Sequence, residues 1–169
     1  MHYASYLSPV GRLLLTAEGD CLTGLWPAET VPEGAAPGAE QPVLKQTKKW
    51  LDRYFAGEKP EMDIPVDPKG TAFQKQVWQL LLDIDYGQTR TYGALAREMA
   101  RKMGKERMSA QAVGQAVGKN PISILIPCHR CVGANGQMTG YAWGVEKKVW
   151  LLRHEGLTIT DTIIQMTEE

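Results

Sequence analysis

A segment rich in proline and glycine divides this 169-residue sequence into two parts of different character. Residues 57–70 contain three prolines, which interrupt helices and strands and are typical of linkers between domains. Before this segment, turn signals separate three short apolar runs typical of β-strands, at residues 3–7, 12–17 and 22–26. An amphipathic pattern predicts one helix over residues 43–55. We therefore expect a small α/β domain over residues 1–70.

After the linker, apolar periodicity predicts a mostly helical domain over residues 71–156. Thr71 and Gln74 have the spacing of a capping box, which predicts that a first helix begins there. A second helix is expected over residues 92–103. Ser109 is a good N-cap for a third helix over residues 110–118. Two helices joined by a short basic connector are typical of the helix-turn-helix motif that binds DNA. Helix pairs also occur in many proteins that bind nothing, so both interpretations stay open here.

The third predicted helix has almost no side-chain volume. Alanine or glycine occupies five of its positions: Ala110, Ala112, Gly114, Ala116 and Gly118. A glycine inside a helix costs about 1 kcal/mol relative to alanine, so two in so short a helix require an explanation. Either this helix packs closely against another helix, or it approaches a groove in which larger side chains would clash.

Charge is distributed unevenly along the chain, although its 19 basic and 19 acidic residues cancel. Residues 1–85 contain 8 Lys/Arg and 12 Asp/Glu, residues 86–154 contain 11 and 3, and residues 155–169 contain none and 4. A local excess of positive charge attracts a polyanion even when a protein is neutral overall. The simpler interpretation of charge alone is a solvated basic face. If the segment does bind DNA, the binding should be modest and sensitive to salt.

Cysteine content and hydropathy exclude several classes of protein. Three cysteines are too few, and odd in number, for a disulfide scaffold, and they indicate a reducing compartment. No run approaches the roughly 18 apolar residues that a membrane span requires, and the first residues lack the pattern of a secretory signal. We therefore expect a cytoplasmic protein that does not bind membranes.

Residues 120–131 are the segment that most clearly indicates a reactive site, because an apolar, β-branched run there ends in Pro-Cys-His-Arg-Cys. Cationic neighbours raise the thiolate fraction of a cysteine, so Cys128 is a candidate nucleophile. Cys128 and Cys131 also form a C-x-x-C pair, which occurs in redox sites and in zinc sites. Zinc would need two more ligands from distant residues, and a redox pair normally opens a helix, whereas turn-like residues follow here. A buried structural cysteine is the remaining alternative.

A nucleophilic Cys128 requires a base and a group that orients the base. His129 is adjacent, but neighbouring side chains in an extended chain point to opposite faces, so a water molecule or a backbone bend must connect the two. Glu155 follows a predicted helix over residues 145–154 and is a candidate to hold His129 in the correct tautomer. Alternatively, Glu155 is a solvent-facing charge at the end of that helix.

These motifs together resemble the O6-alkylguanine-DNA alkyltransferases, also called methylated-DNA–protein-cysteine methyltransferases. The resemblance rests on Asn120-Pro121, Ile-Leu-Ile-Pro-Cys-His-Arg at residues 124–130, Gly140-Tyr141, and Trp-Leu-Leu-Arg-His-Glu-Gly at residues 150–156. It implies an α/β N-terminal domain of ribonuclease-H-like shape and a winged-helix-like C-terminal domain that contains the helix-turn-helix. The remaining residues, 157–169, are expected to form an acidic tail.

The resemblance implies DNA repair by direct alkyl transfer. Such a protein binds double-stranded DNA containing O6-alkylguanine, flips out the damaged base, and moves the alkyl group from O6 of guanine, or O4 of thymine, irreversibly to its own cysteine. It needs no cofactor or metal, acts once, and is expected to be a monomer. The alternative is a non-catalytic sensor of alkylated DNA, but related sensors lack the cysteine that this chain has at Cys128.

The positions that match the family's catalytic residues are Cys128, His129, Glu155, Asn120 and Tyr92. The resemblance makes Cys128 the acceptor of the alkyl group, with His129 taking its proton through a water molecule and Glu155 orienting His129. Asn120 is expected to brace the active-site turn. Tyr92 is expected to donate a proton or hydrogen bond to the leaving guanine.

The resemblance also implies two groups of binding residues, one for the flipped base and one for DNA. Tyr141 is expected to pack on the flipped base, and the backbone of Cys131 and Ala142 to read its edge. The small-residue helix is expected to enter the minor groove with Ser109, Ala110, Gln111, Ala112 and Gly114.

Two positions depart from the family pattern. Gln111 stands where an arginine commonly fills the gap left by the flipped base, which predicts weaker extrusion of that base. Trp143 stands where several members have glycine, which predicts a narrower pocket that prefers methyl to larger groups.

Overall fold

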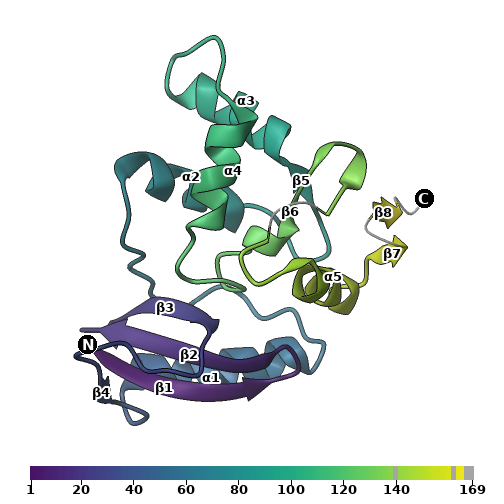
Figure 1. Ribbon diagram of the computed structural model, residues 1–169. Helices are drawn as coiled ribbons and strands as arrows, with labels where there is room; N and C mark the ends of the chain where they lie inside the picture. The colour runs from purple at the N-terminus through teal and green to yellow at the C-terminus, as the bar shows by residue number, and fades with distance from the viewer. Residues whose placement is uncertain (139–140, 161–162, 166–169) are drawn as a thin grey trace. The chain divides into compact units, whose positions relative to one another are not determined.

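The computed structural model describes residues 1–138, 141–160 and 163–165 and divides into two compact units (Figure 1). The first unit comprises Met1–Lys69 together with Pro121–Leu125, and the second comprises Gly70–Asn120 together with Ile126–Glu169. None of the helices in the described part of the chain has the length and hydropathy needed to cross a membrane.

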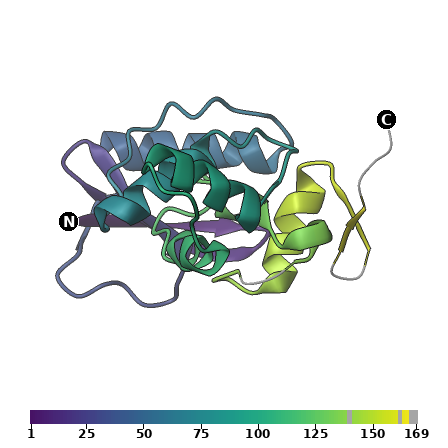
Figure 2. The ribbon, with the colours of Figure 1, turned by 90° about the horizontal axis from the view of Figure 1, so that it is seen from above.

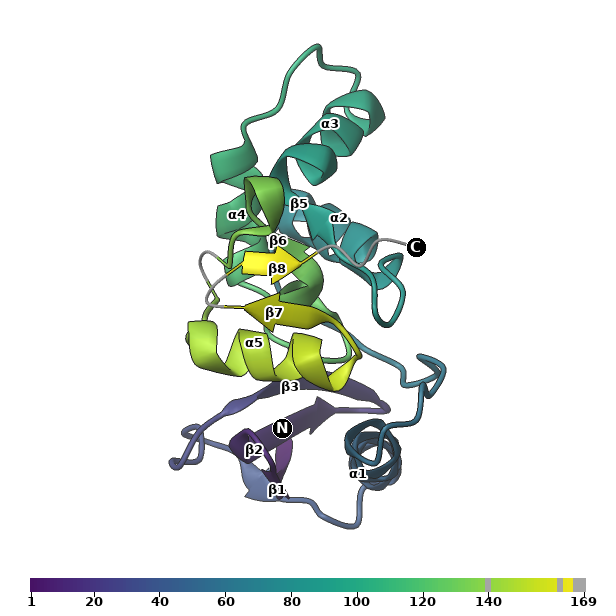
Figure 3. The ribbon, with the colours of Figure 1, turned by 90° about the vertical axis from the view of Figure 1, so that its right-hand side faces the viewer.

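The first unit is built on a four-stranded sheet with the strand order β3-β2-β1-β4. β1 (His2–Ser8), β2 (Gly11–Glu18) and β3 (Cys21–Pro27) form an antiparallel meander, and the short β4 (Ala36–Pro37) pairs in parallel with β1. The helix α1 (Pro42–Phe55) packs across one face of the meander, where Figure 3 shows it end-on. The three predicted strands and the predicted helix are confirmed, because their patterns are local and strongly periodic.

The outer edge of β3 is paired with a segment from much later in the chain. Leu25 donates its N–H to the carbonyl of Pro121 (2.8 Å), and Ser123 donates its N–H to the carbonyl of Leu25 (3.1 Å). These bonds satisfy backbone groups that an edge strand would otherwise expose. They also make residues 121–125 part of the first unit, so the segment that leads to Cys128 starts at this sheet edge.

Three helices form the centre of the second unit: α2 (Ala72–Leu82), α3 (Tyr92–Lys102) and α4 (Ala110–Gly118). They lie together in Figure 2, and the indole of Trp78 on α2 donates to the carbonyl of Ala116 on α4 (2.8 Å). The predicted capping box at Thr71 is present, and the Ser109 side chain caps α4 as predicted. The predicted helices are therefore confirmed, with ends that differ by at most one residue where a range was predicted.

The remainder of the second unit surrounds α5 (Val145–His154). β5 (Arg90–Thr91) pairs in parallel with β6 (Cys131–Val132), and β7 (Thr158–Thr160) pairs with β8 (Ile163–Gln165) as a hairpin beside α5 (Figure 3). A small apolar core joins them through Val132, Met138, Val149, Leu152 and Ile159. The expected acidic tail thus begins with a hairpin, while its residues 161–162 and 166–169 lie outside the described residues.

Candidate active site

Two tight turns shape the backbone immediately before Cys128. At Ile124, where φ is 71°, the two flanking residues are joined by a backbone hydrogen bond of 2.9 Å. At Pro127 the N–H of Cys128 donates to the carbonyl of Ile126 (2.8 Å). Bonds that span two residues are those of γ-turns, and a positive φ is rare for a β-branched residue. The backbone therefore bends twice before it reaches the cysteine and does not continue as an extended chain.

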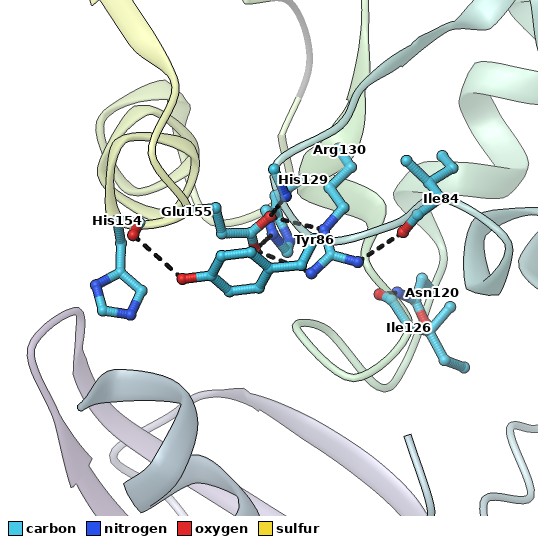
Figure 4. A network of polar contacts seen from close by, with 9 residues as sticks. Ile84, Tyr86, Asn120, Ile126, His129, Arg130, His154 and Glu155 are labelled. Carbon is cyan, nitrogen blue, oxygen red and sulfur yellow. Dashed lines mark hydrogen bonds and ion pairs between the residues drawn. The ribbon is translucent and has the colours of Figure 1, made fainter. Parts of the chain in front are cut away.

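Asn120 braces the second turn. Its side-chain amide donates to the carbonyl of Ile126 (2.8 Å), the same oxygen that accepts the N–H of Cys128 (Figure 4). The chain then continues as a 3₁₀ helix over Cys128–Arg130, in which Cys128 is only 4% exposed and His129 is fully buried. The Asn120 side chain thus supports this turn through a hydrogen bond, and the turn rather than a strand sets the directions of the next side chains.

Glu155 is the centre of a buried polar network (Figure 4). One carboxylate oxygen lies 2.6 Å from His129 Nε2, and the Arg130 guanidinium donates to both oxygens at 2.8 and 3.2 Å. The backbone N–H of Gly87 adds a further bond at 3.2 Å. The Glu155 side chain is fully buried, so the alternative of a solvent-facing charge is wrong.

The network determines which nitrogen of His129 carries hydrogen. Burial alone would raise the pKa of Glu155, but the hydrogen bond from His129 and the hydrogen-bonded positive charge of Arg130 outweigh it and hold that pKa below its usual range. Burial lowers the pKa of His129 even though Glu155 opposes the shift, so the ring is neutral. An ionised carboxylate only accepts hydrogen bonds, so Nε2 of His129 must carry the hydrogen. Nδ1 therefore keeps its lone pair, and this buried atom has no hydrogen-bond partner among the described residues.

Arg130 anchors the network to the segment after α2. Its guanidinium donates to the carbonyl of Ile84 (2.7 Å) and lies 5.7 Å from the ring centroid of Tyr86. The Tyr86 hydroxyl in turn donates to the carbonyl of His154 (3.3 Å). Sequence reasoning treated Arg130 only as a charge near the thiol and did not identify Tyr86 or Gly87. The one available signal was the position of Arg130 directly after His129.

Lys148 is a second functional residue that the sequence did not reveal. It is fully buried on α5, with Nζ 3.5 Å from the Tyr92 hydroxyl and 5.7 Å from the centroid of that ring. Burial lowers the pKa of Lys148, while the nearby thiols of Cys131 and Cys128 act in the opposite direction. Burial also raises the pKa of Tyr92, which remains a phenol. Lys148 therefore contacts the predicted proton donor, and its charge acts on both cysteines.

The predicted DNA-binding residues meet Tyr92 in one groove of about 590 Å³. Ala110, Gln111 and Gly114 of α4 line it together with Tyr92 at the start of α3. Ser109 and Gln111 are exposed, whereas Ala112 is partly buried and does not line the groove. The structure thus brings the small-residue helix and one predicted catalytic residue to the same surface.

A second groove of about 580 Å³ lies between α3 and the connector that follows it. Four basic side chains line it: Arg97, Arg101, Lys105 and Arg107. This groove concentrates part of the positive charge found in residues 86–154 on one surface of the second unit.

The residues predicted to contact the flipped base form a separate cluster before α5. The ring of Tyr141 is buried, and its centroid lies 5.7 Å from that of Trp143. Ala142 between them is exposed. Gly140, which belongs to the same motif, lies outside the described residues.

Cysteine and metal chemistry were also weighed from the sequence. Cys21, Cys128 and Cys131 are all thiols. Within the ranges that the structure describes, no three His, Cys, Asp or Glu side chains are grouped as metal ligands would be.

Comparisons with known proteins cover nearly the whole chain. Residues 1–68 match the ribonuclease-like domain of 6-O-methylguanine DNA methyltransferase, and residues 72–157 match the DNA binding domain of the same protein. The chain is 42% identical to a methylated-DNA–protein-cysteine methyltransferase of Methanosarcina acetivorans, over 92% of this chain and 99% of the relative. It is also 42% identical to one of Mycobacterium leprae, over 94% and 96%. The crystal structure of Mycobacterium tuberculosis OGT in complex with DNA is similar, with a TM-score of 0.80 and 42% identity over 92% of both chains.

Proposed function

The chain belongs to the 6-O-methylguanine DNA methyltransferase family, and from this premise we propose that Cys128 is the residue that accepts the alkyl group. The protein is a methylated-DNA–protein-cysteine methyltransferase, which repairs DNA by alkyl transfer. The observation that carries the proposal is the buried chain of contacts from Glu155 to His129, next to a cysteine in a braced turn.

His129 acts as the base through Nδ1. Glu155 fixes Nε2 as the protonated nitrogen, so the lone pair of Nδ1 is available to take the thiol proton through a water molecule. The thiolate of Cys128 then attacks the alkyl carbon in line with the bond to O6. The sulfur–carbon bond forms as the carbon–oxygen bond breaks, and guanine leaves with the electron pair. The product is a stable thioether, so each molecule reacts once.

Tyr92 supplies the proton that the leaving guanine requires. Lys148 donates to its hydroxyl oxygen, which polarises the O–H bond and makes the phenol a better donor. Lys148 therefore acts as a positioning residue for Tyr92. Its positive charge also favours the thiolate form of Cys128, because opposite charges attract strongly in a buried site.

The partner is double-stranded DNA containing O6-alkylguanine, and we place it on α4. A helix of small residues allows the backbone of the minor groove to approach closely, and Gln111 lies at the groove that contains Tyr92. Gln111 would fill the gap left by the flipped base through its amide. The four basic residues beside α3 would contact phosphates on the same duplex.

The flipped base would lie against Tyr141, with Trp143 limiting the size of the alkyl group. Their ring centroids lie 5.7 Å apart, and the residue between them, Ala142, is exposed and has a backbone N–H. That N–H, with the backbone carbonyls of Cys128 and Cys131, would read the edge of guanine. We include O4-alkylthymine as a second substrate of the same pocket.

The setting that suits this chemistry is the reducing cytoplasm, where an acceptor cysteine stays a thiol. All three cysteines of the chain are thiols, which fits this location.

The test is mass spectrometry after incubation with a duplex that contains O6-methylguanine. We expect one methyl group on the peptide that contains Cys128, and none in a Cys128→Ser variant that still binds the duplex. Cys21→Ser, which changes a cysteine in the other unit, is the control and should react normally. A methyl group on another residue would refute the assignment, and binding without any transfer would support the damage-sensor alternative.

A further inference from the structure

We infer that Cys128 and Cys131 form a reversible disulfide under peroxide stress, which shields the acceptor from irreversible oxidation. Alkyl transfer does not use the thiol of Cys131, since only its backbone carbonyl is assigned a role. The C-x-x-C pattern noted in the sequence is therefore not explained by DNA repair.

The backbone between the two cysteines has the geometry that a disulfide requires. Cys131 donates its N–H to the carbonyl of Cys128, which closes one turn of 3₁₀ helix over Cys128–Arg130. A 3₁₀ helix rises about 2 Å per residue, so residues three apart have Cα atoms about 6 Å apart and eclipsed side chains. Disulfides span Cα distances of roughly 4.4–6.8 Å, so the bond requires rotation of side chains rather than movement of the backbone.

The surroundings of the two thiols give them different roles. Cys128 is 4% exposed, whereas Cys131 is fully buried in β6, so an oxidant that enters the base pocket reaches Cys128 first. Burial raises the pKa of Cys131 to about 12, which keeps it a thiol that does not compete for the oxidant. The positive charge of Lys148 acts on both thiols and favours their ionised forms.

The reaction balances with a peroxide as the only co-reactant. The thiolate of Cys128 attacks one oxygen of hydrogen peroxide, a sulfur–oxygen bond forms, the oxygen–oxygen bond breaks, and hydroxide leaves and is protonated to water. Cys131 sulfur then attacks the sulfenic acid of Cys128, the sulfur–sulfur bond forms, and hydroxide leaves with the Cys131 proton as a second water. Two thiols lose two electrons, and the peroxide gains them. A dithiol reductant then donates two electrons, which restores both protein thiols while the reductant becomes a disulfide.

The experiment exposes the full-length protein to hydrogen peroxide and then to dithiothreitol. We expect the intact protein to lose two hydrogen atoms in mass. Trypsin cleaves after Arg130, so the disulfide would join two peptides that are otherwise separate. Methyl acceptance should fall about tenfold or more and return after reduction. The mass measurement does not depend on the assignment of Cys128 as acceptor, so failure of that assignment is distinguishable from failure of this inference.

The variants are each compared with their own untreated activity. Cys21→Ser should behave as wild type. Cys131→Ser should instead gain oxygen atoms on Cys128, and dithiothreitol should restore its activity only slightly, because sulfinic acid is not reduced by thiols. Oxygen addition to Cys128 without a linked peptide in the wild type would overturn the inference. Equal recovery of methyl acceptance by the wild type and by Cys131→Ser after reduction would also overturn the inference.

Discussion

Glu155→Gln tests the buried network most directly, because it removes one charge and almost no volume. The wild-type carboxylate neutralises Arg130, whose side chain is only 11% exposed, and it also holds His129. Removing one partner of a buried ion pair leaves an uncompensated charge and costs about 3–5 kcal/mol. The free energy of unfolding of a domain is about 5–15 kcal/mol, so we expect a folded but clearly weakened protein.

The same substitution should slow methyl transfer for a separate reason. An amide is able to donate as well as accept, so it no longer forces the hydrogen of His129 onto Nε2. In hydrolases, loss of the carboxylate that sets the histidine tautomer lowers the rate about 10⁴-fold, and we expect a loss of at least about 10²-fold here. Urea unfolding measures the first effect, and single-turnover transfer from a methylated duplex measures the second.

A double variant separates stability from chemistry. Arg130→Met with Glu155→Gln removes both charges, so no unpaired guanidinium remains, and stability should recover by about 1–3 kcal/mol relative to Glu155→Gln alone. The transfer rate should stay low, because His129 still lacks its carboxylate. The matched control is Glu58→Gln, which breaks an exposed ion pair with Arg53 (3.2 Å) and should change stability by less than about 1 kcal/mol. If Glu155→Gln costs no more than Glu58→Gln, or if the double variant transfers methyl groups at the wild-type rate, the role given to Glu155 is wrong.

Four further outcomes follow from the site. Gln111→Ala should slow repair of duplex DNA and Gln111→Arg should speed it, measured as the rate of methyl transfer; an unchanged rate in Gln111→Ala contradicts its role in the stack. Trp143→Gly should raise the rate with O6-benzylguanine relative to O6-methylguanine, and a constant ratio of the two rates would exclude Trp143 as the limit on size. Replacing both Arg101 and Lys105 by Gln should weaken binding to undamaged duplex. It should also make the negative slope of log K against log salt shallower by about 0.9 for each lost phosphate contact. An unaltered slope would show that this groove does not contact DNA. The lowered pKa of His129 means that the unfolded chain binds this proton more readily than the folded protein does, so the urea midpoint should fall as the pH drops below about 6.5, and a flat midpoint between about pH 7.5 and 5.5 would argue against a buried neutral ring.

Local signals predicted the helices of the second unit, because the groups that begin each helix are close in sequence. The Thr71 side chain accepts from the N–H of Gln74, and that of Ser109 accepts from the N–H of Ala112. A hydrogen bond across three residues depends on residue type and spacing alone, so it is visible without a structure. The strands of the first unit were predictable for the same reason, from short apolar runs and the turn residues between them.

The conformation of Ile124 was not predictable from local sequence, because it opposes the preference of its residue type. Isoleucine favours extended backbone, yet Ile124 adopts a φ of 71°. Such a conformation costs on the order of 1–3 kcal/mol and persists only where other contacts impose it. Here those contacts come from β3 on one side of Ile124 and from the Asn120 side chain on the other. The bonds to β3 are tertiary, and no pattern in the apolar run reveals them, whereas the brace from Asn120 was expected from the family resemblance.

Lys148 shows a second limit of sequence reasoning. Lys147 and Lys148 are adjacent on α5, and composition does not distinguish them, yet only Lys148 is fully buried. Which of the two turns inward depends on the rotation of α5 about its axis, and the apolar core around Val149 and Leu152 sets that rotation. A buried lysine is costly unless its charge has a partner, which is why its position beside Tyr92 and two thiols indicates function.

The two glycines of α4 bear on a question that composition left open. A Cβ at Gly118 would meet nothing within 4 Å, and one at Gly114 would make only ordinary contacts of 3.6 and 3.8 Å with Tyr92. Packing against the described residues therefore does not require glycine at either position, although each lowers helix stability by about 1 kcal/mol relative to alanine. Gly114 lines the groove that also contains Gln111 and Tyr92. Close approach of a DNA backbone to this groove would give Gly114 a role that internal packing does not.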